Sequence, residues 1–295
     1  MTSFFKPGPA TDPIYINARD GLENFHVRGR EYLERIYRES APYVDHDSAE
    51  KATRDLAAVF WELQLAYAVK SAGKNLVQRD RLKYKNNKGP DLFVEDPDVW
   101  LEAVVATRGE GLDALQYPET MMKVCKKDFN GIVLRLRSVI EDKSKQFNEY
   151  KKDGIVKPNQ ATVIAISGVL FPDRFPGKPP EIVRAVYPAG NLATEFNRVT
   201  KTMSDLYLEY RDCVKKIGGA GVATDIFLKP EFSHISVVLY GYVNWVDPPN
   251  PPGADFIIVH NPMALTPLPD GWFPFGVEYW CRDGERLESR RHGSL

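Results

Sequence analysis

The segment 89–105 has the sequence GPDLFVEDPDVWLEAVV, in which two short apolar runs surround one turn. The runs Asp91–Glu95 and Val99–Thr107 are rich in residues that favour β-strands. The dipeptide 96–97 between them, Asp-Pro, is typical of a turn. We therefore predict that these residues form an antiparallel hairpin.

The register of this hairpin would bring two carboxylates together. A two-residue loop pairs Glu95 with Asp98 and places Asp91 opposite Glu102, on the same face and with Cβ atoms about 5 Å apart. Facing carboxylates repel each other unless a cation neutralises them, and Mg²⁺ is commonly held by one or two carboxylates, water and a substrate phosphate. In the alternative, Asp91 lies in water at a strand end and Glu102 points outward as a surface residue.

Glu62 is a third acid of interest. Its neighbours on a helix, Val59, Leu65, Ala66 and Val69, are apolar, so Glu62 projects from a stripe that should face the sheet. The alternative is a glutamate at the edge of that stripe whose carboxylate reaches water.

The helix expected after the hairpin carries three polar residues on one face. Lys143, Gln146 and Tyr150 are spaced by three and four residues. A lysine beside a metal site can stabilise the negative charge of an attacking water or of a phosphate in its transition state. The alternative is the ordinary solvated face of an amphipathic helix.

The flanking segments predict an α/β fold with a mixed central sheet flanked by helices. Around the hairpin we expect helices over 21–38, 47–72, 131–150 and within 191–217, and strands over 76–84, 161–167, 234–243 and 255–260. A capping box at Asp47 and Glu50 would begin the second helix, and the last dozen residues would fray. We divide the chain into an arm and helix (1–48), a core of order αβββαβ (49–167), and an α/β extension packed on the same domain (168–295).

Composition narrows the class of protein. The chain has 295 residues, 39 Lys and Arg against 40 Asp and Glu, and 43% hydrophobic residues, which is typical of a folded domain. No apolar run reaches the roughly 18 residues of a membrane span, and the start lacks the pattern of a secretory signal. We therefore expect a cytoplasmic protein with no membrane partner. The three cysteines are far apart and predict neither disulfides nor a zinc cluster.

Basic residues gather on both sides of the hairpin in the sequence. Segment 74–88 has six basic residues against one acid, and segment 121–157 has ten against five. An acidic site between basic segments suits a polyanionic backbone such as that of nucleic acid.

These motifs together resemble those of the PD-(D/E)XK nuclease superfamily. Glu62 on a leading helix, the segment 89–91 (GPD) opening a strand and the segment 102–104 (EAV) on the next strand match its short motifs. The segment 146–150 (QFNEY) matches the QxxxY signature of its RecB-like branch. The resemblance implies a restriction-endonuclease-like core, with Asp91 and Glu102 as metal ligands and Glu62 as a further acid that binds the metal directly or through water.

The chain departs from the family at its motif lysine, whose position holds Val104. Some members resemble this chain in carrying the lysine on the following helix, where Lys143 is the first candidate and Lys145 the second. The family's activity would be Mg²⁺- or Mn²⁺-dependent cleavage of nucleic acid, with DNA a better candidate than RNA. The chain itself could form a homodimer. Its catalytic residues would be Asp91, Glu102, Lys143, Glu62, Gln146 and Tyr150. The alternatives are an inactive nuclease-fold module that binds nucleic acid or a protein, and an unrelated α/β protein whose acids are structural.

Overall fold

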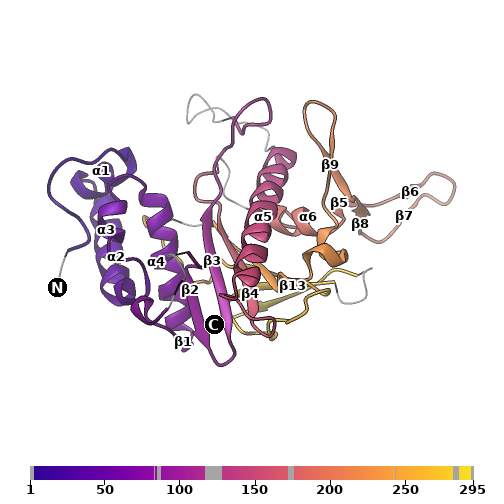
Figure 1. Cartoon of the computed structure of the whole chain (residues 1–295). Helices are drawn as coiled ribbons and strands as arrows, with labels where there is room; N and C mark the ends of the chain where they lie inside the picture. Colours follow the sequence, from indigo (N-terminus) through magenta and orange to yellow (C-terminus); the bar gives the residue numbers. More distant parts are fainter. Residues whose placement is uncertain are drawn as a thin grey trace.

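An eight-stranded mixed sheet forms the centre of the protein, with helices on both faces (Figure 1). The structure is a computed structural model that describes residues 3–82, 84, 88–116, 128–171, 176–242, 244–281 and 286–293. The strands, in their order across the sheet, are β1 (Asn75–Leu76), β2 (Leu92–Glu95), β3 (Val99–Val105), β4 (Ala161–Ser167), β11 (Val237–Gly241), β12 (Ile257–His260), β13 (Gly276–Trp280) and β14 (Glu288–His292).

The sheet combines parallel and antiparallel pairs. Strands β3, β4 and β11 run parallel to one another, as do β12 and β13, and the other neighbours are antiparallel. One face is covered by α1 (Pro13–Asp20), α2 (Asn24–Ser40), α3 (Ser48–Lys51) and α4 (Leu56–Ser71), and the other by α5 (Phe129–Lys152) and α6 (Glu181–Val186). Short 3-10 helices cover 41–43, 79–81, 226–228 and 230–232. The predicted α/β class and mixed sheet are thus confirmed.

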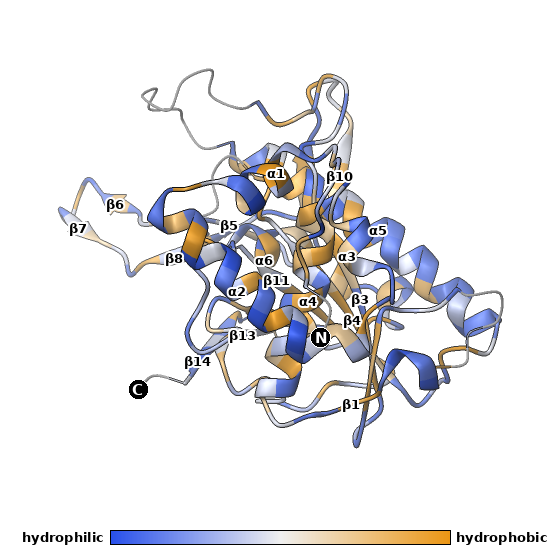
Figure 2. Ribbon diagram, turned by 90° about the vertical axis from the view of Figure 1, so that its left-hand side faces the viewer, coloured by the Kyte–Doolittle hydropathy of each residue, from blue (hydrophilic) through white to orange (hydrophobic). Residues whose placement is uncertain are grey.

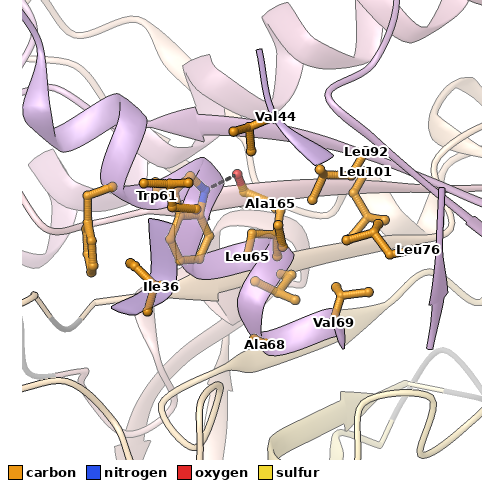
Figure 3. Packing of buried hydrophobic residues seen from close by; sticks show 14 of the residues in the cluster. Ile36, Val44, Trp61, Leu65, Ala68, Val69, Leu76, Leu92, Leu101 and Ala165 are labelled. Atoms are coloured by element: carbon orange, nitrogen blue, oxygen red, sulfur yellow. Dashed lines mark hydrogen bonds between the residues drawn. The ribbon is translucent and has the colours of Figure 1, made fainter. Parts of the chain in front are cut away.

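Helix α4 is the central piece of the first face. It is apolar on nearly all sides because it lies between α2 and the sheet, so that both its surfaces are buried. Figure 3 shows Trp61 and Leu65 of α4 in one cluster with Leu92 and Leu101 of the hairpin, with Trp61 next to Ala165. The indole N–H of Trp61 donates to the Ala165 carbonyl of β4 at 2.9 Å, which fixes the helix against the sheet. Glu62, the next residue, is therefore held at a defined place.

The hairpin has the predicted register. Leu92 pairs with Leu101 and Val94 with Val99. Continued by one residue, this register places Asp91 opposite Glu102. Helix α5 and strand β4 also lie where the sequence predicts them, and the order α4, β1, β2, β3, α5, β4 is the predicted αβββαβ.

The expected helix over 47–72 is two helices. Asp47 makes no capping bond, and α3 ends after one turn. Asp55 caps α4 instead, its carboxylate accepting from the Ala58 amide at 3.0 Å. The carboxylate of Asp12 also accepts from the Leu56 amide, at 2.6 Å. The break therefore satisfies the free amides at the start of α4 with carboxylates, one of which comes from a distant part of the chain.

The expected strand over 76–84 is wrong beyond Leu76. The chain turns into a short 3-10 helix at 79–81, because the Arg79 side chain points back to the hairpin, where it donates to the Asp91 carbonyl at 2.9 Å.

The expected helix within 191–217 is also wrong. This region forms the hairpins β5 (Ala189–Ala193) with β8 (Tyr207–Tyr210), β6 (Phe196–Asn197) with β7 (Thr202–Met203), and β9 (Cys213–Lys215) with β10 (Gly221–Ala223). Phe196 and Met203 pair across two strands and stay 57% and 65% exposed. Ala189 and Val214 of these strands pack on the core on the α5 side, whereas the outer hairpin stays exposed, so the apolar residues do not form the single stripe that a helix would need.

The predicted fraying of the last dozen residues is wrong for Glu288–His292, which form β14. Strand β14 pairs with β13 over five residues. The buried carboxylate of Glu278 in β13 accepts from His260 of β12 at 3.1 Å and from His292 of β14 at 2.6 Å. These bonds hold the last strand to its neighbours. Strands β11 to β14 continue the sheet of β1 to β4, while the boundaries at 48 and 167 stay a prediction.

Candidate functional site

The site is built on the acids of the hairpin. Asp91 lies one residue before β2, and its Oδ2 accepts from the Ala103 amide of β3 at 2.7 Å. Glu102 lies in the middle of β3 and is only 4% exposed. Both side chains are on the face of the sheet that α5 covers. Glu102 is therefore buried, and the alternative in which it is a surface residue in water is wrong.

Helix α5 brings a lysine onto this pair. Lys143 Nζ lies 2.6 Å from Glu102 Oε1 and 3.0 Å from Gln146 Oε1, and Gln146 Nε2 donates to the Tyr150 hydroxyl. The three polar residues of α5 therefore form a chain that ends on Glu102. Lys145 points elsewhere and pairs with Glu141 at 3.0 Å on the exposed side of the helix.

The two carboxylate oxygens of Glu102 differ in their hydrogen bonding. Oε1 binds Lys143, whereas Oε2 is buried and has no hydrogen-bond partner. A buried carboxylate oxygen without a partner costs free energy, on the order of 1–3 kcal/mol. A cation between Glu102 and Asp91 would remove that cost.

The electrostatics of the acids agree with this geometry. Burial, followed by the charge of Asp91, raises the pKa of Glu102 to about 8, against the opposing effect of Lys143. Burial also raises the pKa of Asp91, although the hydrogen bond from Ala103 lowers it. The acids thus share a region of low solvation in which their negative charges disfavour one another.

Glu62 reaches the same region from the opposite layer. It is half-buried on α4, and burial, followed by the charge of Asp91, raises its pKa to about 8. This burial argues against the alternative in which Glu62 extends into water.

Arg79 is a site residue that sequence reasoning missed. Its guanidinium donates to the carbonyls of Pro90 and Asp91 at 3.2 and 2.9 Å, to the Tyr84 hydroxyl at 2.9 Å, and to Asp45 at 2.9 Å. Its charge lowers the pKa of all three site acids, Glu62, Asp91 and Glu102. In the sequence, Arg79 stood out only as one of the basic residues of segment 74–88. The expected strand over 76–84 did not predict that its side chain would point toward the hairpin.

Two carboxylates, those of Asp91 and Glu102, are the candidate ligands for a metal ion. Among the described residues, no group of three or more His, Cys, Asp or Glu side chains converges as the ligands of one ion would. Asp91 with the bare oxygen of Glu102 still fits Mg²⁺, which keeps much of its water and needs one or two protein carboxylates. Three cavities of the protein lie away from this site, since none of its acids lines them.

Some residues counted in the sequence lie outside the described part of the chain: Lys83, Lys85, Lys123, Lys126, Lys127 and Cys125. Comparison with known proteins gave no match to a family model, a curated protein or a solved structure. In the described residues, no helix is long and apolar enough to cross a bilayer.

Proposed function

We propose that the protein is a metal-dependent phosphodiesterase that cleaves nucleic acid, with DNA as the preferred substrate. The observation that carries this proposal is the facing pair Asp91 and Glu102, in which one oxygen of Glu102 binds Lys143 and the other is buried without a partner. Most buried carboxylate oxygens in folded proteins have a hydrogen-bond partner, so a bare one beside a second acid favours a bound cation. The αβββαβ order and the short motifs support the proposal by resemblance.

Asp91 and Glu102 would hold the metal ion, with Glu62 as the further acid. The chemistry that Mg²⁺ or Mn²⁺ supplies when bound is activation of water and neutralisation of charge on phosphate oxygens. The reaction is a hydrolysis, in which the water oxygen bonds to phosphorus and the bond from phosphorus to one sugar oxygen breaks. One proton of the water goes to the leaving sugar oxygen, and the other stays with the new phosphate monoester or is released to solvent.

Other residues of the site would orient the acid pair and stabilise the negative charge of the phosphate. Lys143 brings a positive charge to the acid pair and can offset the charge that develops on the phosphate. Gln146 holds Lys143, and Tyr150 accepts a hydrogen bond from Gln146. Arg79 fixes the backbone at Asp91.

A second candidate is an inactive nuclease-fold module. Val104 stands at the family's lysine position, and no third ligand converges with the acid pair among the described residues. In such a module, Lys143 would act only as the counter-ion of Glu102.

Cleavage assays separate the two candidates. Labelled single- and double-stranded DNA and RNA are incubated with wild-type protein and with Glu102→Gln, in Mg²⁺, in Mn²⁺ and in EDTA. We expect wild-type protein to cut DNA only with a divalent ion, and Glu102→Gln to lose at least 10²-fold in rate. If wild-type protein cuts no substrate with either ion, the enzyme proposal fails, and binding of nucleic acid by the same protein would then favour the inactive module.

A further inference from the structure

Three arginine side chains of α2 lie along one wall of a cavity far from the acid pair in sequence. Arg28, Arg35 and Arg38 line it together with Val246–Pro248 of the connection between β11 and β12, and its volume is about 430 Å³. Spacings of seven and three residues place the arginines on one face of the helix. Figure 2 shows α2 on the near side of the molecule, with hydrophilic stretches along its length.

These guanidinium groups are not used by the protein in ion pairs. Within the described residues, none of the three forms a salt bridge, although Arg19 and Arg54 nearby in the chain pair with Asp20 and Glu50. Arg38 donates one bond to the Glu34 carbonyl at 3.3 Å, and Arg35 lies over the Tyr32 ring at 5.1 Å. Most of their donors are therefore free for a ligand.

The shape of the cavity is held by packing. Gly29 is buried inside α2, and a Cβ at this position would meet the Trp245 ring at 3.0 Å. Glycine inside a helix costs about 1 kcal/mol relative to alanine, and here it lets the 245–248 segment approach the helix. Trp245 is fixed in turn by Phe60 of α4, with ring centres 5.4 Å apart. Both walls of the cavity therefore rest on the core.

We propose that this cavity binds the phosphodiester backbone of a nucleic-acid strand. Seven helical residues span about 10.5 Å, so the row of guanidinium groups is long enough to contact more than one phosphate of a strand. Planar guanidinium groups bind phosphate oxygens in pairs, and a concave wall suits a strand better than a flat bilayer. The substrate class in this inference rests on the proposed function.

Two acidic residues that line the same cavity, Glu31 and Asp247, provide an internal control for the proposed binding of a polyanion. Their negative charges oppose a polyanion, so their removal should have the opposite sign to removal of the arginines. An outside control is the pair Arg290 and Arg291, which are exposed on β14 at the far edge of the sheet.

The experiment measures binding without turnover. Fluorescence anisotropy follows a labelled 30-nucleotide single strand and a 30-base-pair duplex in EDTA, at 50 to 200 mM salt, with all variants in the Glu102→Gln background. For the duplex, we expect Arg28→Gln/Arg35→Gln to lower the slope of log K against log salt by about 1.8, for two lost phosphate contacts. Glu31→Gln should tighten binding, and Arg28→Lys/Arg35→Lys should keep most of the slope. Thermal unfolding checks that the variants fold.

Equal slopes for Arg28→Gln/Arg35→Gln and Arg290→Gln/Arg291→Gln would overturn the proposal, as would wild-type protein that binds neither nucleic acid. Binding to phosphatidylserine vesicles that is lost in the arginine variant, with nucleic-acid binding unchanged, would assign the face to a membrane and also overturn it. Binding that depends on Arg28 and Arg35 in a protein that cuts nothing supports this inference and rejects only the proposed enzyme.

Discussion

At the scale of single residues, the contrast between Lys143 and Lys145 is the sharpest test of the site. Both are lysines on α5, but only Lys143 contacts Glu102. We expect Lys143→Gln to lower the single-turnover rate of cleavage by about 10²–10³-fold, because charge stabilisation at the phosphate is lost. Lys145→Gln should change the rate by less than twofold. Equal effects of the two substitutions would show that Lys143 has no special role.

The raised pKa values of the acids make stability depend on pH. Glu102 and Glu62 have pKa values of about 8 in the folded protein against 4.5 ordinarily. Between about pH 5 and 8 the unfolded chain therefore binds fewer protons than the folded one, so the stability that these acids contribute as protonated groups is lost as pH rises. We expect the free energy of unfolding to fall over this range, by up to about 1.4 kcal/mol per pH unit for each group.

Urea unfolding at several pH values measures this slope. Glu102→Gln is neutral at every pH and should flatten it, while Glu95→Gln, an exposed change on the same hairpin, should leave it unchanged. A slope that Glu102→Gln does not alter would mean that Glu102 is already ionised in the folded protein at neutral pH.

At the scale of elements, the two helices over 47–72 offer a matched pair of substitutions. Asp55 caps α4, whereas Asp47 makes no capping bond and only an exposed ion pair with Lys51. We expect Asp55→Ala to lower the free energy of unfolding by about 1 kcal/mol and Asp47→Ala by less than about 0.5 kcal/mol. Chemical denaturation checks both values. A larger loss for Asp47→Ala would restore the capping box that the sequence suggested.

Local pattern predicted the elements whose burial follows from their own residues. The hairpin, α5 and the fully buried β4 are of this kind, because their apolar period and turn residues already define which side faces the core. The break before α4 could not be predicted in this way, since it depends on a carboxylate 44 residues away. The hairpins of 189–223 were missed because nothing in the sequence says which of their apolar residues contact the core, as Ala189 and Val214 do, and which stay exposed.

The candidate site divides along the same line. The facing of Asp91 and Glu102 follows from a two-residue loop and strand alternation, and helical spacing put Lys143 on one face with Gln146. The choice of Lys143 over Lys145, however, requires the packing of α5 on β3. The role of Arg79 could not be predicted from the sequence, because it depends on hydrogen bonds from its side chain to the backbone carbonyls of Pro90 and Asp91.

At the scale of the whole molecule, a bound cation should stabilise the fold. A ligand that binds only the folded state at 100 times its Kd adds about 2.7 kcal/mol, which corresponds to a rise in Tm of several degrees for a chain of this size. We expect 10 mM Mg²⁺ to raise the Tm of wild-type protein at pH 8 more than at pH 6, because the pKa of Glu102 is about 8 and its carboxyl is protonated at the lower pH. Calorimetry measures both shifts.

The matched control is the double variant Asp91→Asn/Glu102→Gln, which keeps the shape of the pair and removes its charges. Its Tm should not respond to Mg²⁺. An equal rise in both proteins would assign the effect to ions bound elsewhere and leave the acid pair without a metal.

Helix α5, which packs on β3, is synthesised after that strand, and this order matters while the chain is still on the ribosome. Glu102 leaves the ribosome 41 residues before Lys143, the cation that offsets its charge in the finished protein. A nascent chain halted before α5 would carry this glutamate without Lys143, and one face of the hairpin would lack the cover of α5. Any fragment that ends there should therefore expose apolar surface of the sheet that chaperones can bind.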